Sequence, residues 1–166
     1  LQGIVVAIII SLIGLSSQTA HIKVHVIGRK RGVDVLRPLS PEHPDDETFE
    51  GMLILRPEGR LFFVNAQLVA EQIKALLAQY QPKVLVLDMS RVPDIEYSAL
   101  QMLVDGELQS SERGVSLWLA GLNPGVLEVV RHTMLAERLG RERMLFNTRA
   151  AIERFQALKS QGVVAP

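Results

Sequence analysis

Acidic and hydroxyl side chains are concentrated in residues 88–100, directly after an apolar run that is typical of a buried strand. The segment contains three carboxylic acids and two serines, and it leads into a stretch with the apolar spacing of a helix. In α/β sheets, the loops beyond the carboxyl ends of the strands form the edge that faces ligands. We therefore expect this segment to lie at a ligand-facing or partner-facing edge.

Ser98 stands at the predicted start of that helix and has two interpretations. A serine at a helix start commonly caps the helix by accepting backbone N–H bonds, which is worth about 1 kcal/mol. Alternatively, a phosphate on Ser98 would meet free N–H groups and the positive end of the helix dipole. The carboxylates of Asp94 and Glu96 would repel that phosphate, so the residues alone favour capping.

Signatures of enzymes do not occur in the sequence. It contains no G-x-G-x-x-G after a strand, no Walker A lysine motif, no G-x-S-x-G and no H-E-x-x-H. Residues 28–32 hold two glycines around three basic residues, but the amphipathic helix that a phosphate-binding loop requires does not follow. We therefore predict no enzymatic activity, no catalytic residue and no resident cofactor.

Metal and nucleic-acid binding are disfavoured as well. The chain has no cysteine, which excludes disulfides, zinc–thiolate sites and thiol nucleophiles. His21 and His25 would be about 13 Å apart on a strand, so they would not converge on a metal ion. Eighteen basic and eighteen acidic residues give a formal net charge of +0, which provides no global attraction for nucleic acid.

Alternating strand and helix patterns predict how the acidic segment is positioned. The predicted strands are residues 21–26, 52–55, 61–64, 84–87, 116–120 and 144–146, of which 52–55 and 61–64 have hairpin spacing. The predicted helices are residues 65–79 capped by Asn65, residues 98–113, the segment opened by Pro124, and a last segment capped by Asn147 or Thr148. This order predicts an α/β layered domain with a mostly parallel central sheet and helices packed on it.

The amino-terminal segment is apolar. Residues 1–22 carry no charged side chain, and residues 4–15 are apolar on every face of a helix. This run accounts for the slightly positive mean hydropathy of +0.19. Because a membrane-spanning helix needs about 20 apolar residues, we interpret residues 1–17 as the end of a last transmembrane helix in a longer protein. A buried core element and a signal peptide are the alternatives, and basic residues placed after the apolar run disfavour the signal peptide.

A linker with segregated charges, residues 18–50, follows the apolar segment and includes the strand predicted at its start. Residues 23–33 carry four basic side chains and no acidic one, which predicts the cytoplasmic side of a membrane by the positive-inside rule. We expect these four residues to contact anionic lipid head groups; they are Lys23, Arg29, Lys30 and Arg31. The folded domain is then expected to span residues 51–166.

From residue 51 to about residue 155, the chain resembles a STAS domain, the module shared by SulP-type anion transporters and bacterial anti-sigma-factor antagonists. The resemblance rests on Leu-Phe-Phe-Val-Asn-Ala at residues 61–66, on Leu-Asp-Met-Ser and Asp-Ile-Glu-Tyr-Ser-Ala-Leu within residues 87–100, and on the Leu-Ala-Gly turn at 119–121 and Leu-Gly at 139–140. The apolar segment before the domain is similar to the SulP arrangement, in which the STAS domain follows the last membrane helix.

The resemblance implies a cytoplasmic regulatory domain of a SulP-type secondary anion transporter, of the sulfate or bicarbonate class, in the cell (inner) membrane. The implied partners are the transmembrane domain of the same polypeptide, a second copy in a homodimer of the full transporter, and a regulatory protein. Family members are proposed to bind a nucleotide or a protein through one edge, which here corresponds to Asn65, Asp88, Ser90, Asp94, Glu96 and Ser98.

The resemblance also bears on Ser98, which falls where the antagonist branch carries its phosphorylated serine. That branch reads Asp-Ser-Ser-Gly, whereas this chain reads Glu-Tyr-Ser-Ala at residues 96–99. Two alternative functions therefore remain: a soluble anti-sigma-factor-antagonist-like phospho-switch that binds a kinase, and a nucleotide-binding regulatory module.

Overall fold

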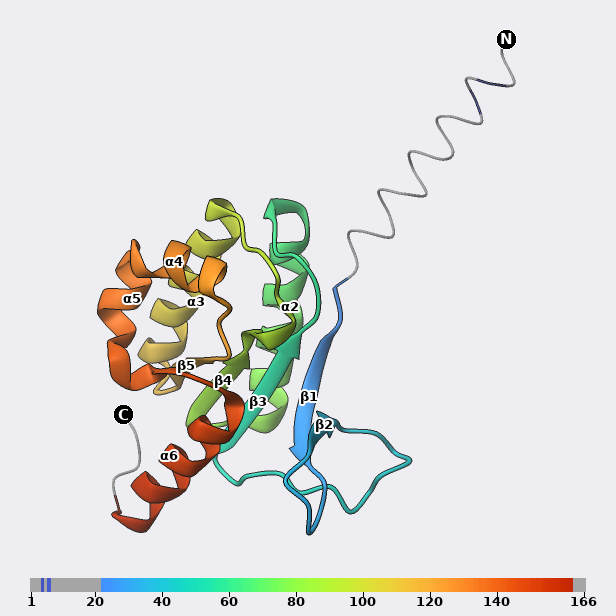
Figure 1. Ribbon diagram of the computed structural model, residues 1–166, viewed down its shortest axis with the longest axis vertical. Helices are drawn as coiled ribbons and strands as arrows, with labels where there is room; N and C mark the ends of the chain where they lie inside the picture. The colour runs from blue at the N-terminus through green and yellow to red at the C-terminus, as the bar shows by residue number, and fades with distance from the viewer. Residues whose placement is uncertain (1–3, 5, 7–21, 163–166) are drawn as a thin grey trace.

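One six-stranded sheet organises the fold (Figure 1). The computed structural model describes residues 4, 6 and 22–162. The strand order is β2-β1-β3-β4-β5-β6. Strands β3 to β6 are parallel, whereas β1 pairs antiparallel with both β2 and β3. The predicted α/β class with a mostly parallel sheet is confirmed, and the two antiparallel strands make the sheet mixed.

The elements alternate along the chain much as the apolar periodicity predicts. The strands are β1 (Val24–Arg29), β2 (Leu36–Pro38), β3 (Met52–Pro57), β4 (Val84–Asp88), β5 (Ser116–Ala120) and β6 (Met144–Leu145). The helices are α2 (Phe63–Tyr80), α3 (Tyr97–Glu112), α4 (Pro124–Arg131), α5 (Met134–Leu139) and α6 (Thr148–Ser160), with short 3-10 helices η1 (Met89–Arg91) and η2 (Arg141–Arg143).

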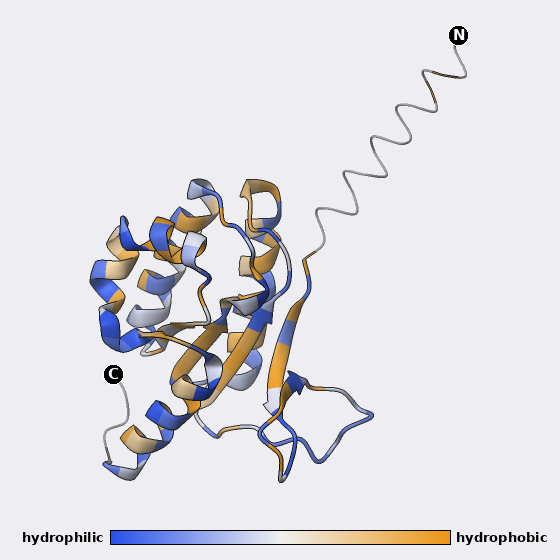
Figure 2. Ribbon diagram, viewed as in Figure 1, coloured by the Kyte–Doolittle hydropathy of each residue, from blue (hydrophilic) through white to orange (hydrophobic). Residues whose placement is uncertain are grey.

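Both faces of the central strands are covered by helices, and this explains their unbroken apolar runs. Side chains alternate along a strand, so one set in β3, β4 and β5 packs against α2, α3, α4 and α5, and the other set packs against α6. Leu55 and Leu87 belong to the first set, and Ile54, Val86 and Trp118 to the second. Figure 2 shows these strands as an apolar centre between the helices.

The hairpin predicted for residues 52–64 is wrong. Strand β3 already pairs with β1 on one side and β4 on the other, so no position beside it is open to residues 61–64. Leu61 instead forms an isolated parallel bridge with Ile95, and its backbone N–H donates to the carbonyl of Asp94 at 3.0 Å. Phe63 is already the first residue of α2. The loop after β3 therefore pairs with the loop after β4.

The segregated charges of residues 18–50 pair with one another in the fold. The guanidinium of Arg29 donates to the Glu47 carboxylate at 2.8 and 3.0 Å and lies over the Phe49 ring. Arg37 and Asp46 form a second two-bond pair, at 2.8 Å for each bond. The Arg29 charge is therefore engaged within the linker by Glu47.

The chain joins the domain beside the carboxyl end of β3. Val24, the first residue of β1, pairs with Pro57, the last residue of β3. The Gln72 side chain of α2 donates to the Ile22 carbonyl at 3.0 Å and accepts from the Val24 N–H at 3.3 Å. Residues 1–17, predicted to end a membrane helix, lie outside the described residues apart from Ile4 and Val6. Within the described part of the chain, no helix is long and apolar enough to cross a membrane.

Candidate functional site

The fold places the residues of the predicted binding edge near one end of the sheet, where the parallel strands terminate. Asp88 is the last residue of β4, Ser90 lies in η1, and Asp94 lies in the loop that leads to α3. Asn65 lies in the first turn of α2, and Ser98 lies in the first turn of α3. Their burial and hydrogen bonds, however, assign them different tasks.

Asp88 is buried, with 1% of its surface exposed, and its carboxylate is fully engaged within the fold. Its Oδ2 accepts two hydrogen bonds from the Arg56 guanidinium, at 2.7 and 2.9 Å, and its Oδ1 accepts one from the Ser90 N–H at 3.0 Å. Gly121 follows β5 with a φ of 69°. A Cβ there would also lie 3.2 Å from the Ser90 Cβ, so only glycine fits without strain. Asp88 therefore ties β3 to the start of the loop after β4, against which Gly121 packs closely.

The contribution of the Arg56–Asp88 pair to the free energy of unfolding is expected to depend on pH. Burial alone would raise the pKa of Asp88, but hydrogen bonds from Ser90 and the Arg56 guanidinium offset it and leave the pKa below its ordinary value of 3.8. A lowered pKa in the folded state stabilises the fold above the ordinary value, and that stability is lost as the pH falls through the folded pKa. We expect the difference in free energy of unfolding between wild type and Asp88→Asn to be largest at pH 5–7 and to shrink below about pH 4. Urea denaturation across this pH range measures it, and a difference that does not change with pH would contradict the assignment.

Asn65 is fully buried and is not the helix cap that its residue type predicts. Phe62 is the N-cap of α2, and Asn65 is the third residue of the helix. Its Oδ1 accepts from the Phe62 N–H at 3.0 Å, and its Nδ2 donates to the Arg60 carbonyl at 2.9 Å. Asn65 therefore shapes the loop between β3 and α2 and does not offer its amide to a ligand.

Ser98 is likewise not the N-cap of its helix. Glu96 holds that position, so Ser98 is the second residue of α3 and is half-buried. The Glu96 carboxylate accepts from the Phe63 N–H at 3.3 Å and thereby joins the first turns of α2 and α3. Asp94 pairs with Arg60 at 2.7 Å. Glu96 thus links the two helix starts, and Asp94 links the loops that precede them.

Exposed apolar side chains at this end form a patch that the sequence analysis missed. Phe63, Val64 and Tyr97 are 68%, 61% and 68% exposed, and they occupy the first turns of α2 and α3. We call these three residues the edge patch. Because residues 61–64 form a short apolar run with hairpin spacing from residues 52–55, the sequence predicts Phe63 and Val64 in a strand. A helical stripe through Ala66, Val69 and Ile73 would have placed Val64 on the opposite, outer face and Phe63 at the margin of the stripe.

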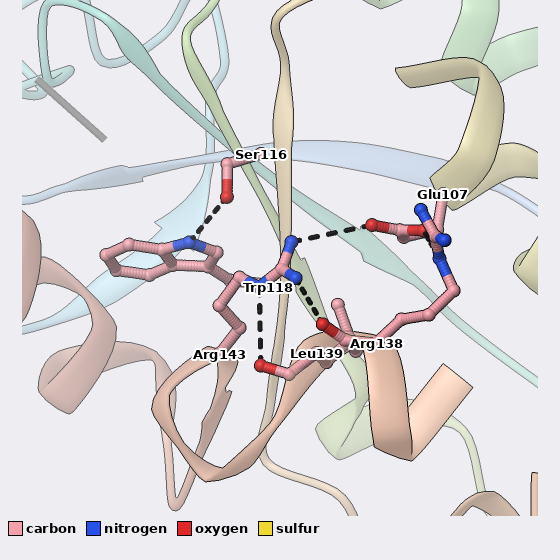
Figure 3. A network of polar contacts seen from close by, with 6 residues as sticks. All are labelled: Glu107, Ser116, Trp118, Arg138, Leu139 and Arg143. Atoms are coloured by element: carbon pink, nitrogen blue, oxygen red, sulfur yellow. Dashed lines mark hydrogen bonds and ion pairs between the residues drawn. The ribbon is translucent and has the colours of Figure 1, made fainter. Parts of the chain in front are cut away.

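A second polar cluster lies away from this edge and holds α5 in place (Figure 3). Glu107 of α3 is 1% exposed and pairs with Arg138 of α5 and with Arg143 of η2. Arg143 also donates to the carbonyls of Arg138 and Leu139. Within residues 22–162 and at positions 4 and 6, no group of three or more histidine, cysteine or acidic residues could hold a metal ion.

Comparison with known protein families shows to which family this chain belongs. The sequence model of the STAS domain matches residues 43–152. The chain belongs to the STAS domain family. The predicted resemblance is confirmed, and the six-stranded sheet with its helices is a STAS fold.

The STAS chain is related in sequence to plant sulfate transporters. It is 28% identical over 160 residues to high affinity sulfate transporter 2 of Stylosanthes hamata, covering 90% of this chain and 24% of that protein. Against sulfate transporter 1.3 of Arabidopsis thaliana the identity is 24%, with 91% and 24% covered. The chain thus spans about a quarter of the length of these relatives.

Solved structures show the same fold at lower identity. The inward-facing murine Slc26a9 anion transporter matches with a TM-score of 0.81 and 19% identity, over 94% of this chain and 26% of that one. The STAS domain of a SulP transporter from Vibrio cholerae matches with a TM-score of 0.58 and 20% identity, over 73% and 91%. The anti-sigma factor antagonist SpoIIAA in its unphosphorylated form matches with a TM-score of 0.55 and 14% identity, over 67% and 93%.

Proposed function

We propose that this STAS domain is the cytoplasmic regulatory and interaction domain of a SulP-type secondary anion transporter, of the sulfate or bicarbonate class, in the cell (inner) membrane. The observation that carries the proposal is the sequence relationship to sulfate transporters across about 90% of this chain and a quarter of theirs. The transport site would then lie in the membrane domain of the same polypeptide. No residue of this domain would bind the anion, and the domain would perform no chemistry.

The edge patch is the surface that we propose to contact the membrane domain of the transporter, which would be a homodimer. The chain enters at this end, because Ile22 packs beside Gly59 and the Glu58 N–H donates to the Lys23 carbonyl at 3.2 Å. If a membrane helix ends near residue 17, the other helices of the membrane domain would therefore lie close to the starts of α2 and α3. Exposed aromatic side chains are the residues that most often anchor protein interfaces.

Charged groups around the edge patch favour a protein partner over a bare anionic membrane. The acidic residue Glu96 bonds to the backbone of the patch at Phe63, and the acidic residue Asp94 lies nearby in an ion pair with Arg60. Anionic lipid would be repelled there. Of the basic residues predicted to contact lipid, Lys23 is exposed at the end where the chain enters the domain, whereas Lys30 and Arg31 are exposed beyond the opposite end of β1. A regulatory protein could use the same patch when the membrane domain releases it.

Transport measurements on the full-length transporter test the proposal. Deletion of residues 51–166 is expected to impair uptake of radiolabelled sulfate or bicarbonate, or assembly at the membrane. The paired change Phe63→Ser and Tyr97→Ser is expected to lower uptake at least five-fold, because two aromatic anchors each contribute about 1 kcal/mol or more. Leu108→Ser, at an exposed position on α3 outside the patch, is the matched control.

Two outcomes would refute different parts of this proposal. Unchanged uptake by the deletion variant at normal membrane levels would exclude a regulatory role of the domain. If the deletion impairs uptake but the patch variant transports normally, the regulatory role of the domain would stand. The edge patch would then be excluded as the contact surface.

The two alternative functions receive less support from the geometry. A phospho-switch at Ser98 would place the phosphate beside the carboxylates of Asp94 and Glu96. A nucleotide at the binding edge would need polar groups, but the Asp88 carboxylate and the Asn65 amide are already bound within the chain. Phosphate measured at Ser98 after incubation with a cognate kinase and ATP would restore the first alternative.

A further inference from the structure

An apolar groove of about 420 Å³ runs between α2 and α3, above the sheet. Its floor is formed by Leu85, Leu87 and Leu117 of β4 and β5, and its walls include Ile73 of α2 and Leu103 of α3. Cavities that bind small molecules are mostly apolar and measure about 300–1,000 Å³. The groove is therefore large enough for a ligand, and it is separate from the edge patch.

Small residues on both helices keep the groove open. Ala70 and Ala78 of α2 and Ala99 and Gly106 of α3 line it. A Cβ added at Gly106 would meet no atom within 4 Å, so the groove is open at this half-buried position. A glycine within a helix destabilises it by about 0.5–1 kcal/mol relative to alanine. Gly106 thus lowers helix stability at a position where the groove has free space.

The charged side chains that line the groove are both cationic. Lys74 lies in the second half of α2, and Arg113 is the C-cap of α3. Neither forms an ion pair with another residue of the described chain. Arg113 lies at the carbonyl end of α3, where the helix dipole is negative, and Lys74 lies six residues before the end of α2, so an anion in the groove would be attracted by these two side chains alone. Toward the other end the groove reaches Leu61 and Ile95 and is apolar.

We infer that this groove binds a single-chain anionic amphiphile of the fatty-acid class. The acyl chain would lie along the apolar floor, and the carboxylate would meet Lys74 and Arg113. A nucleotide or a sugar would leave its polar groups unpaired against an apolar lining, which disfavours burial. A straight acyl chain has no such groups, and its head group complements the cationic mouth. The inference does not depend on the proposed role in transport.

Calorimetric titration of residues 1–166 with dodecanoate, below its micelle concentration, tests the inference. Affinity is expected to rise about four-fold for each methylene between octanoate and dodecanoate, because each buried methylene contributes a fixed free energy. Dodecanol is expected to bind at least five-fold more weakly than dodecanoate, and dodecyltrimethylammonium more weakly still. Equal affinity for the anionic and the cationic probe, or no heat with any probe, would overturn the inference.

Variants separate the groove from nonspecific binding. Gly106→Leu, which fills the groove, is expected to lower dodecanoate affinity at least ten-fold, whereas Gly106→Ala, the matched backbone control, is expected to keep most of it. Lys74→Gln with Arg113→Gln is expected to reduce dodecanoate affinity to that of dodecanol, while Arg131→Gln on α4 is expected to change nothing. Unaltered binding by Gly106→Leu would overturn the inference. The inference would also be overturned if wild type bound no dodecanoate while Gly106→Leu changed the molecular mass measured by sedimentation. That result would assign the groove to a second copy of the chain.

Discussion

Replacement of Arg56 by methionine is expected to lower the free energy of unfolding by about 3 kcal/mol at pH 7. Arg56 is itself mostly buried and donates two of the three hydrogen bonds that the Asp88 carboxylate accepts. Without the guanidinium, the buried Asp88 carboxylate would lack its counterion. It would then either stay charged without compensation for its lost hydration or take up a proton. Urea denaturation with linear extrapolation measures the loss.

Arg60→Met is the matched control for this variant. Arg60 also pairs with an aspartate at 2.7 Å, but both side chains are exposed, at 70% for Arg60 and 52% for Asp94. Exposed pairs contribute about 0–1 kcal/mol, so this variant is expected to remain close to wild type. Equal losses for Arg56→Met and Arg60→Met would show that burial does not set the strength of the Asp88 pair. Asp88→Leu combined with Arg56→Met is expected to recover part of the loss, since no unpaired charge then remains.

Replacement of Glu107 by alanine is expected to lower the free energy of unfolding by about 2 kcal/mol. The carboxylate neutralises Arg138 and Arg143, which would otherwise face each other (Figure 3). The loss is smaller than for Arg56 because these arginines are 34% and 29% exposed and can regain water. Denaturation measures the total effect, and hydrogen exchange of Met134–Leu139 is expected to show that α5 loosens first.

Glu137→Ala is the control for the Glu107 variant, because Glu137 lies on α5 itself but is exposed. Its stability is expected to stay within about 0.5 kcal/mol of wild type. Protection of α5 that is unchanged in Glu107→Ala would refute the role of this cluster in holding α5 against α3.

Local patterns were sufficient to predict most of the elements. The apolar runs that became β4 and β5 are continuous because helices cover both faces of the sheet, so the pattern and the structure report the same burial. Asn147 caps α6 as predicted, since its Oδ1 accepts from the Ala150 N–H at 2.8 Å. Capping depends on residues within one helical turn, which the sequence displays directly.

The wrong predictions concern helix caps and strand pairing, where a local pattern is compatible with more than one structure. Asn65 and Ser98 are both favoured at helix caps, but Phe62 and Glu96 occupy the cap positions in the fold. Residues 61–64 form a short apolar run at hairpin spacing, yet β1 takes the place beside β3 that a hairpin would need. The competition for that place involves residues far apart in the chain, so no local window could reveal it.

Periodicity predicted an α/β domain and the end of the sheet at which polar residues gather, and the resemblance of its motifs, including those within residues 87–100, identified the STAS family. The roles of those residues depended on long-range contacts. Asp88 meets Arg56 because the register of β4 against β3 brings the two side chains together. Because of this pairing, Asp88, which the sequence predicts to bind a ligand, stabilises the fold instead. The edge patch and the groove between α2 and α3 likewise follow from how two helices pack on the sheet, because burial is set by neighbours that are distant in sequence.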